Sequence, residues 1–212
     1  MKESINKDIL YDYLLSLFKS KVLKWSSDKD KKQNEELFRR VYKLSEIKFK
    51  WKFRDSWEPY FEHLVRTANI VLTEFGNPTI DKVILALLHD IYEDTSVLSD
   101  TLWLISNEDI YEKIKFISKN DETLKWDNKK KQYFERLLTC TDETIIDVKL
   151  ADRIDNLRTI WCWEKEKIIK KLNETRKYIL PLAEKYNKKA YKFLQEEISK
   201  IEQTLILESK PE

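Results

Sequence analysis

Hydrophobic residues recur at helical spacing along most of the chain. Residues 6–24 place aliphatic and aromatic side chains three and four positions apart, and residues 34–46 repeat this pattern. The same spacing predicts further helices at 60–75, 79–92, 99–106, 109–118, 128–139, 144–162 and 165–208, the last bent or broken at Pro181. Helices therefore account for nearly the whole chain.

One segment departs from this pattern. Residues 47–54, IKFKWKFR, alternate apolar and basic side chains with a period of two, which predicts an extended segment with one cationic edge. The edge could attract phosphates or contact RNA. It fits equally well a solvated edge with Phe49, Trp51 and Phe53 packed beneath it.

Composition supports a helical protein. The chain has 212 residues and one glycine, where average usage would give about fifteen. This excludes phosphate-binding loops and dinucleotide fingerprints, which need several glycines, and it disfavours a fold rich in β-hairpins. We predict an all-α protein with an N-terminal helical extension at residues 1–32 and one globular domain at residues 33–212.

Charge and cysteine content limit the partners. The 40 basic and 38 acidic residues nearly cancel, so nucleic acid is not an expected partner. Cys140 and Cys162 form no C-x-x-C motif, which argues against a disulfide framework or a thiolate zinc site. No apolar run approaches the roughly 20 residues that span a bilayer. We therefore expect a cytoplasmic protein that does not enter a membrane.

The chain has two histidines, His63 and His89. His89 lies in the string ALLHDIYEDT, directly after a strongly apolar run. On a continuous helix, His89 and Glu93 would be neighbours at i and i+4, as would Asp90 and Asp94. A buried helix that ends this way brings charge to the interior, where it persists only if it is paired or bound to a metal.

A second string, DETIIDVKLADRIDNLRTIW, repeats this arrangement. Asp152, Asn156 and Thr159 lie on one helix face, opposite an apolar stripe. Taken alone, the string fits an ordinary amphipathic helix with a solvated polar face equally well. Combined with the two histidines and the aspartate of the first string, Asp152 completes a set of two imidazoles and two carboxylates. Such a set leaves water positions open around a divalent metal, as hydrolysis requires.

Three motifs in this order resemble a known family. Residues 54–63, RDSWEPYFEH, are similar to R-x-S-G-E-P-Y-I-x-H, and residues 87–95, LLHDIYEDT, are similar to L-L-H-D-x-x-E-D-T. Residues 149–159, KLADRIDNLRT, are similar to K-L-A-D-R-x-x-N-x-R-T, with a looser match at residues 174–186. The chain thus resembles the HD-type phosphohydrolases, and among them the hydrolase domain of the RelA/SpoT alarmone enzymes, over about residues 35–190.

The resemblance implies an HD-domain helical bundle with a short extended segment before the first metal ligand. It implies a metal, usually manganese in this family, held by four residues: His63, His89, Asp90 and Asp152. It also implies that Glu93 and Asp94 position and deprotonate the attacking water. The family's contacts to a purine nucleotide correspond to Arg54, Asn156 and Thr159.

The implied reaction removes the 3′-pyrophosphate of guanosine tetra- or pentaphosphate, giving pyrophosphate and GDP or GTP. The chain ends before a synthetase domain could begin, so we expect a small alarmone hydrolase. Two alternatives stay open. The substrate could be another nucleotide, such as an adenosine alarmone or a pyrophosphorylated RNA end, or the chain could bind nucleotide as a regulatory module without catalysis. The intact pair Glu93 and Asp94 favours an enzyme.

Three positions depart from the family pattern. Trp57 replaces a glycine, and Leu64 stands where a proline usually follows the metal-binding histidine. Asp55 stands where many relatives have lysine. This last change removes or reverses a positive charge that we would expect near the substrate.

Overall fold

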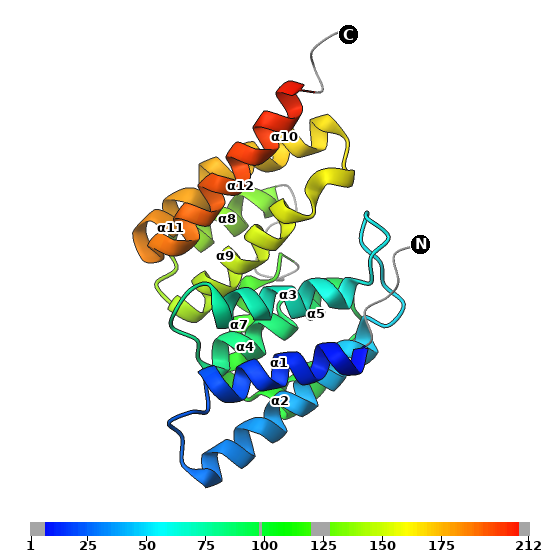
Figure 1. Cartoon of the computed structure of the whole chain (residues 1–212), viewed down its shortest axis with the longest axis vertical. Coiled ribbons are helices and arrows are strands. Elements are labelled where there is room, and N and C mark those ends of the chain that lie inside the picture. The colour runs from blue at the N-terminus through cyan, green and yellow to red at the C-terminus, as the bar shows by residue number, and fades with distance from the viewer. Residues whose placement is uncertain (1–6, 98, 120–127, 208–212) are drawn as a thin grey trace.

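The computed structural model describes residues 7–97, 99–119 and 128–207. These residues form α-helices joined by short loops, with an isolated antiparallel bridge between Phe53 and Pro59 (Figure 1). The all-α class and the short extended segment before His63 are confirmed. Within this described part of the chain, no helix combines the length and the apolarity that crossing a bilayer needs.

The first two helices, α1 (Lys7–Lys21) and α2 (Asp28–Lys48), pack against each other through aromatic side chains. Phe18 and Phe38 are fully buried and stack with their ring centroids 4.8 Å apart. The helix α2 begins earlier than the expected residue 34 because Ser27 caps it, accepting a hydrogen bond from the Asp30 amide. It therefore runs through residue 33, where we expect the globular domain to begin. The division of the chain at that residue stays a prediction.

The expected extended segment at residues 47–54 is wrong for its first residues. The helix α2 continues to Lys48, and Phe49 caps it with its amide bonded to the carbonyl of Ser45. Phe49 is buried and stacks on Tyr60 at 5.0 Å, which favours continuing the helix so that this side chain reaches the core. Trp51 and Phe53 are exposed. Of the three aromatic residues in this segment, only Phe49 packs beneath the basic edge.

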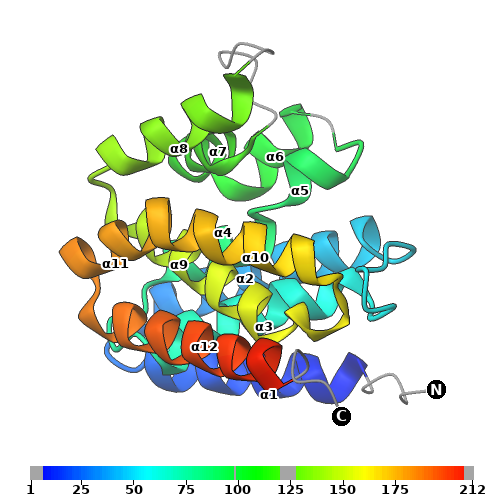
Figure 2. The same cartoon turned by 90° about the horizontal axis from the view of Figure 1, so that it is seen from above.

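Three helices form the centre of the molecule: α3 (Tyr60–Thr73), α4 (Ile80–Leu88) and α9 (Glu143–Arg158). Every residue from Val83 to Leu88 in α4 is fully buried, as its continuous apolar run predicts. Thr79 caps α4, accepting a hydrogen bond from the Lys82 amide. Figure 2 shows α4 and α9 in the middle, with α7 (Glu108–Ile117) and α8 (Lys129–Thr139) on one side and α12 (Lys188–Leu207) and α1 on the other.

The expected continuous helix at 79–92 is wrong. The helix α4 ends at Leu88, His89 is its C-cap, and Asp90 (φ −101°, ψ 0°) precedes the short helix α5 (Ile91–Asp94). Consecutive side chains on a straight helix point about 100° apart, since there are 3.6 residues per turn. The break removes this constraint and allows His89 and Asp90 to face the same site. His89 and Glu93 are therefore not stacked on one helix.

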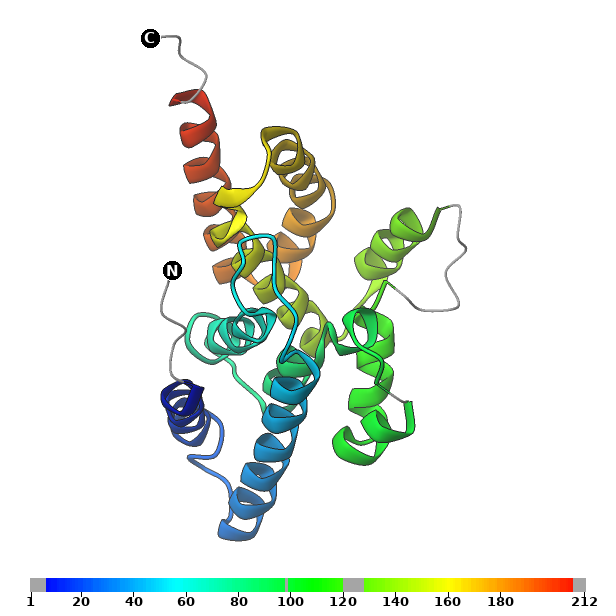
Figure 3. The same cartoon turned by 90° about the vertical axis from the view of Figure 1, so that its right-hand side faces the viewer.

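The remaining helices lie on both sides of α9. Figure 3 shows α9 between a group formed by α6, α7 and α8 and a group formed by α10, α11 and α12. Their bounds are α6 (Ser99–Ser106), α7 (Glu108–Ile117), α8 (Lys129–Thr139), the 3₁₀ turn η2 (Ile160–Cys162), α10 (Lys165–Glu174), the π-helical turn η3 (Thr175–Ile179), α11 (Leu180–Tyr186) and α12 (Lys188–Leu207).

Two expected helices are shorter than the sequence pattern suggests. The helix expected at 144–162 ends at Arg158, and Trp161, assigned to its apolar stripe, is 66% exposed. The helix expected at 165–208 contains the π-helical turn and then breaks at Asn187 (φ −144°, ψ 92°). Pro181 lies in the first turn of α11, directly after the π-helical turn, and Ile179 and Leu180 before it keep helical backbone angles, so the helix does not break at this residue.

Candidate metal centre and active site

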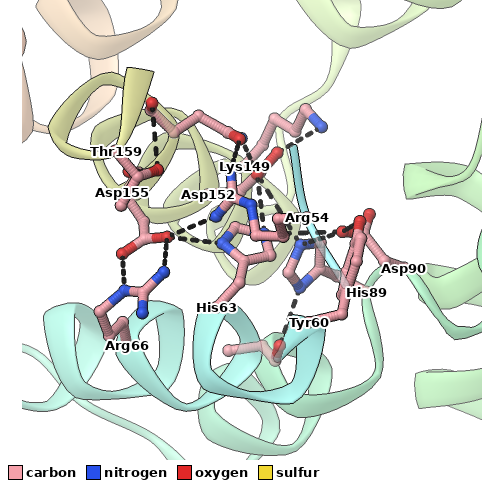
Figure 4. Close-up of polar contacts among 12 residues, drawn as sticks. Arg54, Tyr60, His63, Arg66, His89, Asp90, Lys149, Asp152, Asp155 and Thr159 are labelled. Carbon is pink, nitrogen blue, oxygen red and sulfur yellow. Dashed lines mark hydrogen bonds and ion pairs between the residues drawn. The ribbon is translucent and has the colours of Figure 1, made fainter. Parts of the chain in front are cut away.

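The two histidines lie side by side in the interior, His63 on α3 and His89 at the end of α4 (Figure 4). Their side chains are 2% and 1% exposed, and their ring centroids are 5.2 Å apart. The Nε2 atom of His63 lies 3.5 Å from Asp90 Oδ2 and 3.4 Å from Asp152 Oδ1. The Nε2 atom of His89 lies 3.1 Å and 3.8 Å from the same two oxygens. The structure thus brings the four predicted metal ligands together.

The other nitrogen of each ring is already bonded. His63 Nδ1 lies 2.6 Å from Asp155 Oδ2, and His89 Nδ1 lies 2.8 Å from the carbonyl oxygen of Ala86. Because Nδ1 of each ring is already engaged, Nε2 is the ring atom that faces Asp90 and Asp152, and it can hold either a proton or a metal ion there.

The environment of His89 Nε2 indicates whether a metal fits here. His89 Nε2 makes no hydrogen bond of acceptable geometry to any described residue, although it is fully buried. Leaving such an atom unsatisfied costs about 1–3 kcal/mol. His63 Nε2 and His89 Nε2 lie 3.4 Å and 3.8 Å from Asp152 Oδ1. Ligand atoms about 2.0–2.2 Å from one cation can lie up to about 4.4 Å apart, so one ion can bridge these atoms. These residues fit a divalent metal ion.

Neighbouring side chains keep the two carboxylates ionised and oriented. Tyr60 donates a hydrogen bond to Asp90 Oδ2 at 2.8 Å, and Lys149 Nζ lies 2.7 Å from Asp152 Oδ2. Burial raises the pKa of Asp152, but the Lys149 charge and the His63 hydrogen bond outweigh it and hold the pKa well below its usual range. Burial likewise raises the pKa of Asp90, and the adjacent histidines lower it below the usual range. Both groups are therefore anionic at neutral pH.

The proposed catalytic pair lies on α5, directly after Asp90. Glu93 accepts hydrogen bonds from the amide and the Nζ of Lys119 at 2.5 Å and 3.0 Å, so its carboxylate is fixed in place. Burial and the charge of Asp90 raise the pKa of Asp94. A carboxylate with a raised pKa is better suited to accept a proton near neutral pH.

Two of the three residues expected to contact nucleotide lie beside the candidate metal ligands. Asn156 donates to Asp152 Oδ1 and accepts from Arg54 Nη2 at 2.7 Å, so Arg54 and Asn156 lie beside a candidate metal ligand. The hydroxyl of Thr159 donates to the backbone carbonyl of Asp155 at 2.9 Å, within its own helix. The structure therefore places Arg54 and Asn156 at the site, whereas the Thr159 hydroxyl is used to close the end of α9.

Sequence reasoning missed Asp155, a buried residue of α9. Its carboxylate contacts His63, Arg54 and Arg66 (Figure 4). Burial raises the pKa of Asp155, but hydrogen bonds and charges from His63 and Arg66 outweigh it and hold the pKa at about 2. Its position three residues after Asp152, on nearly the same helix face, was the available signal.

Of the positions that depart from the family pattern, Asp55 and Trp57 precede α3 and Leu64 lies on it. Asp55 forms an ion pair with Lys167 of α10. This pair ties the hairpin at residues 53–59, which the Phe53–Pro59 bridge closes and which carries Arg54, to α10. Trp57 is 84% exposed and has a φ of 61°, a conformation that favours glycine. Leu64 is fully buried in the core on α3.

No protein-family model matches the chain. The guanosine-3′,5′-bis(diphosphate) 3′-pyrophosphohydrolase of Aquifex aeolicus is 30% identical over 153 residues, which is 71% of this chain. The bifunctional (p)ppGpp synthase/hydrolase SpoT of Escherichia coli K12 is 30% identical over 150 residues, or 68% of this chain. The chain belongs to the RelA/SpoT-type HD-domain family. It spans about a fifth of the length of these curated relatives (22% and 21%).

A solved structure supports the fold of this RelA/SpoT-type chain. It is described as a metazoan ortholog of SpoT that hydrolyses ppGpp. The two structures align with a TM-score of 0.69 at 20% identity, covering 77% of this chain and 94% of the other. The likeness confirms the HD-domain helical fold.

Proposed function

We propose that the chain is a divalent-metal-dependent pyrophosphohydrolase that removes the 3′-pyrophosphate of guanosine 3′,5′-polyphosphates, giving GDP or GTP. The observation that supports this most directly is the convergence of two buried histidine Nε2 atoms on two ionised carboxylates, next to the acidic pair of α5. The choice of substrate is supported by two relatives, the guanosine-3′,5′-bis(diphosphate) 3′-pyrophosphohydrolase of Aquifex aeolicus and the (p)ppGpp synthase/hydrolase of Escherichia coli.

His63, His89, Asp90 and Asp152 would hold the metal, and we propose Mn²⁺. Mixed imidazole and carboxylate ligands suit such a cation and leave positions for water. The bound ion would lower the pKa of water and neutralise charge on the phosphoryl group. Tyr60 and Lys149 would keep Asp90 and Asp152 in the orientation that binding needs.

Asp94 would accept the proton of the attacking water, because its raised pKa brings it closer to the working pH. Glu93 would orient this water with a carboxylate that Lys119 holds in place. Arg54, Asn156 and Thr159 would contact the nucleotide. Arg54 brings a permanent positive charge to the site, and Asn156 links that guanidinium to Asp152.

A second candidate keeps the chemistry and changes the nucleotide. It is favoured by Asp55, which pairs with Lys167 and places an acidic side chain where many relatives have lysine. The substrate would then be an adenosine alarmone, another nucleotide or a pyrophosphorylated RNA end.

A substrate panel distinguishes the two candidates. The protein is incubated with Mn²⁺ and guanosine tetraphosphate, its adenosine analogue or a 5′-pyrophosphorylated RNA, and pyrophosphate and phosphate are measured separately. We expect pyrophosphate, released fastest from the guanosine compound. A preference for the adenosine analogue or for RNA supports the second candidate. Nucleotide binding without turnover of any compound supports a regulatory module.

A further inference from the structure

The carboxylate of Asp155 connects a candidate metal ligand to two arginines. Asp155 lies on α9, is 1% exposed, and accepts from His63 Nδ1 through Oδ2 at 2.6 Å. Its Oδ1 accepts from Arg66 Nε at 2.6 Å, and its Oδ2 also accepts from Arg54 Nη1 at 3.0 Å and Arg66 Nη2 at 3.2 Å (Figure 4). Both oxygens are therefore occupied.

These contacts leave the carboxylate little freedom to rotate. Arg66 binds it with two nitrogens, which fixes the plane of the carboxylate. Arg66 is held in turn, since its Nη2 lies 2.7 Å from Glu58 Oε1. A chain of ionic hydrogen bonds thus runs from the hairpin before α3, through Arg66 and Asp155, to His63.

The two histidines of the site differ in what holds their Nδ1 atoms. His89 donates to a neutral backbone carbonyl at 2.8 Å, whereas His63 faces an anionic carboxylate at 2.6 Å. A carboxylate that accepts from Nδ1 fixes the tautomer and the ring orientation and makes Nε2 a stronger ligand. The ring of His63 therefore depends on a side chain, and a substitution can remove that support.

We propose that Asp155 is a positioning residue that holds His63 in the orientation and tautomer needed for metal binding. Arg66 in turn fixes Asp155. This inference rests on the metal site proposed above. Asp155 contacts His63 through the nitrogen that faces away from Asp90 and Asp152, so its direct route to the proposed metal is through that ring.

The first test measures Mn²⁺ affinity by calorimetry on metal-free protein. The variants are Asp155→Asn, which keeps the side-chain size, and Asp155→Leu, which removes the acceptor. The matched control is Asp147→Asn, because Asp147 is also a buried aspartate of α9 but pairs with Lys82 at 2.7 Å and Asn187 at 2.8 Å, outside the site. We expect about 10–100-fold weaker Mn²⁺ binding in both Asp155 variants and unchanged affinity in the control.

A second readout observes the ring itself. With ¹⁵N-labelled histidine and Zn²⁺ as a diamagnetic probe, the spectrum contains only two imidazoles, His63 and His89. The wild type should show a hydrogen-bonded Nδ1–H on both rings. In the Asp155 variants the Nδ1–H signal of His63 should shift or exchange rapidly, while that of His89 stays in place. Asp155→Asn keeps this test available if Asp155→Leu does not fold.

The outcomes separate this inference from the proposed function. Mn²⁺ affinity and a His63 spectrum that match the wild type in both variants overturn it, as does an equal loss of affinity in Asp147→Asn. Weakened binding confined to the Asp155 variants supports it even if the wild type releases no pyrophosphate, a result that would overturn only the proposed reaction. A wild-type protein that binds neither Mn²⁺ nor Zn²⁺ overturns both.

Discussion

The metal site predicts that Mn²⁺ raises the thermal stability of the protein and that His89→Ala removes this rise. The four candidate ligands come from α3, the break between α4 and α5, and α9, which are far apart in the sequence. Because an unfolded chain does not hold them together, metal binding favours the folded state. Binding would also satisfy His89 Nε2, which has no hydrogen bond among the described residues.

The size of the effect follows from linkage. A ligand present at 100 times its dissociation constant stabilises the folded state by about 2.7 kcal/mol. In a protein of this size, each kcal/mol shifts Tm by about 2–4 °C. We therefore expect Mn²⁺ at that excess to raise the Tm of chelator-treated protein by roughly 5–11 °C.

The assay is scanning calorimetry of chelator-treated protein with and without added Mn²⁺. His89→Ala also loses the hydrogen bond to Ala86, so its Tm without metal falls, and the diagnostic quantity is the Mn²⁺-dependent difference. The control is Leu194→Ala, which opens a cavity in the buried part of α12 away from the site and should keep the full Mn²⁺-dependent rise. The same rise in His89→Ala, or none in the wild type, would refute the assignment of His89.

Further variants test the other parts of the site. Glu93→Gln and Asp94→Asn should retain stoichiometric Mn²⁺ by elemental analysis while the rate falls about 10²–10⁴-fold; loss of metal would place them among the ligands instead. Asn156→Ala should weaken both Mn²⁺ and nucleotide binding in calorimetry, because its amide donates to Asp152 and accepts from Arg54. A change in nucleotide KM alone would show that the bond to Asp152 is dispensable. Asp55→Lys should lower KM for an anionic nucleotide most at low salt, since it leaves two unpaired cations at the hairpin. An effect independent of ionic strength would contradict this.

Sequence predicted the helical class and selected the four candidate ligands that the structure brings together, because both inferences rest on local patterns. A single glycine and helical periodicity indicate an all-α fold, and the motifs that contain His63, His89, Asp90 and Asp152 keep the family's spacing. The break after Leu88 could not be predicted in this way. The apolar pattern continues into α5, and the break is favoured by the way His89 and Asp90 meet the other ligands in three dimensions.

The role of Asp155 also could not be predicted from local sequence. In the sequence it is one of several acidic residues of α9, and its spacing from Asp152 indicates a shared helix face but not the side chains that it contacts. Its role depends on Arg66 and His63, which α3 brings to it from a distant part of the chain. The expected continuous helix at 165–208 is wrong for a related reason. The helix breaks at Asn187, whose side chain donates a hydrogen bond to Asp147 of α9, a residue distant in the sequence.

The central claim is tested most directly by identifying the products formed from guanosine tetraphosphate. Chelator-treated protein is incubated with the nucleotide, with and without Mn²⁺, and the products are separated by ion-exchange chromatography. We predict GDP and pyrophosphate in equal amounts, only when Mn²⁺ is present and not with His89→Ala. Release of single phosphates, or the same products from metal-free protein, would contradict the account.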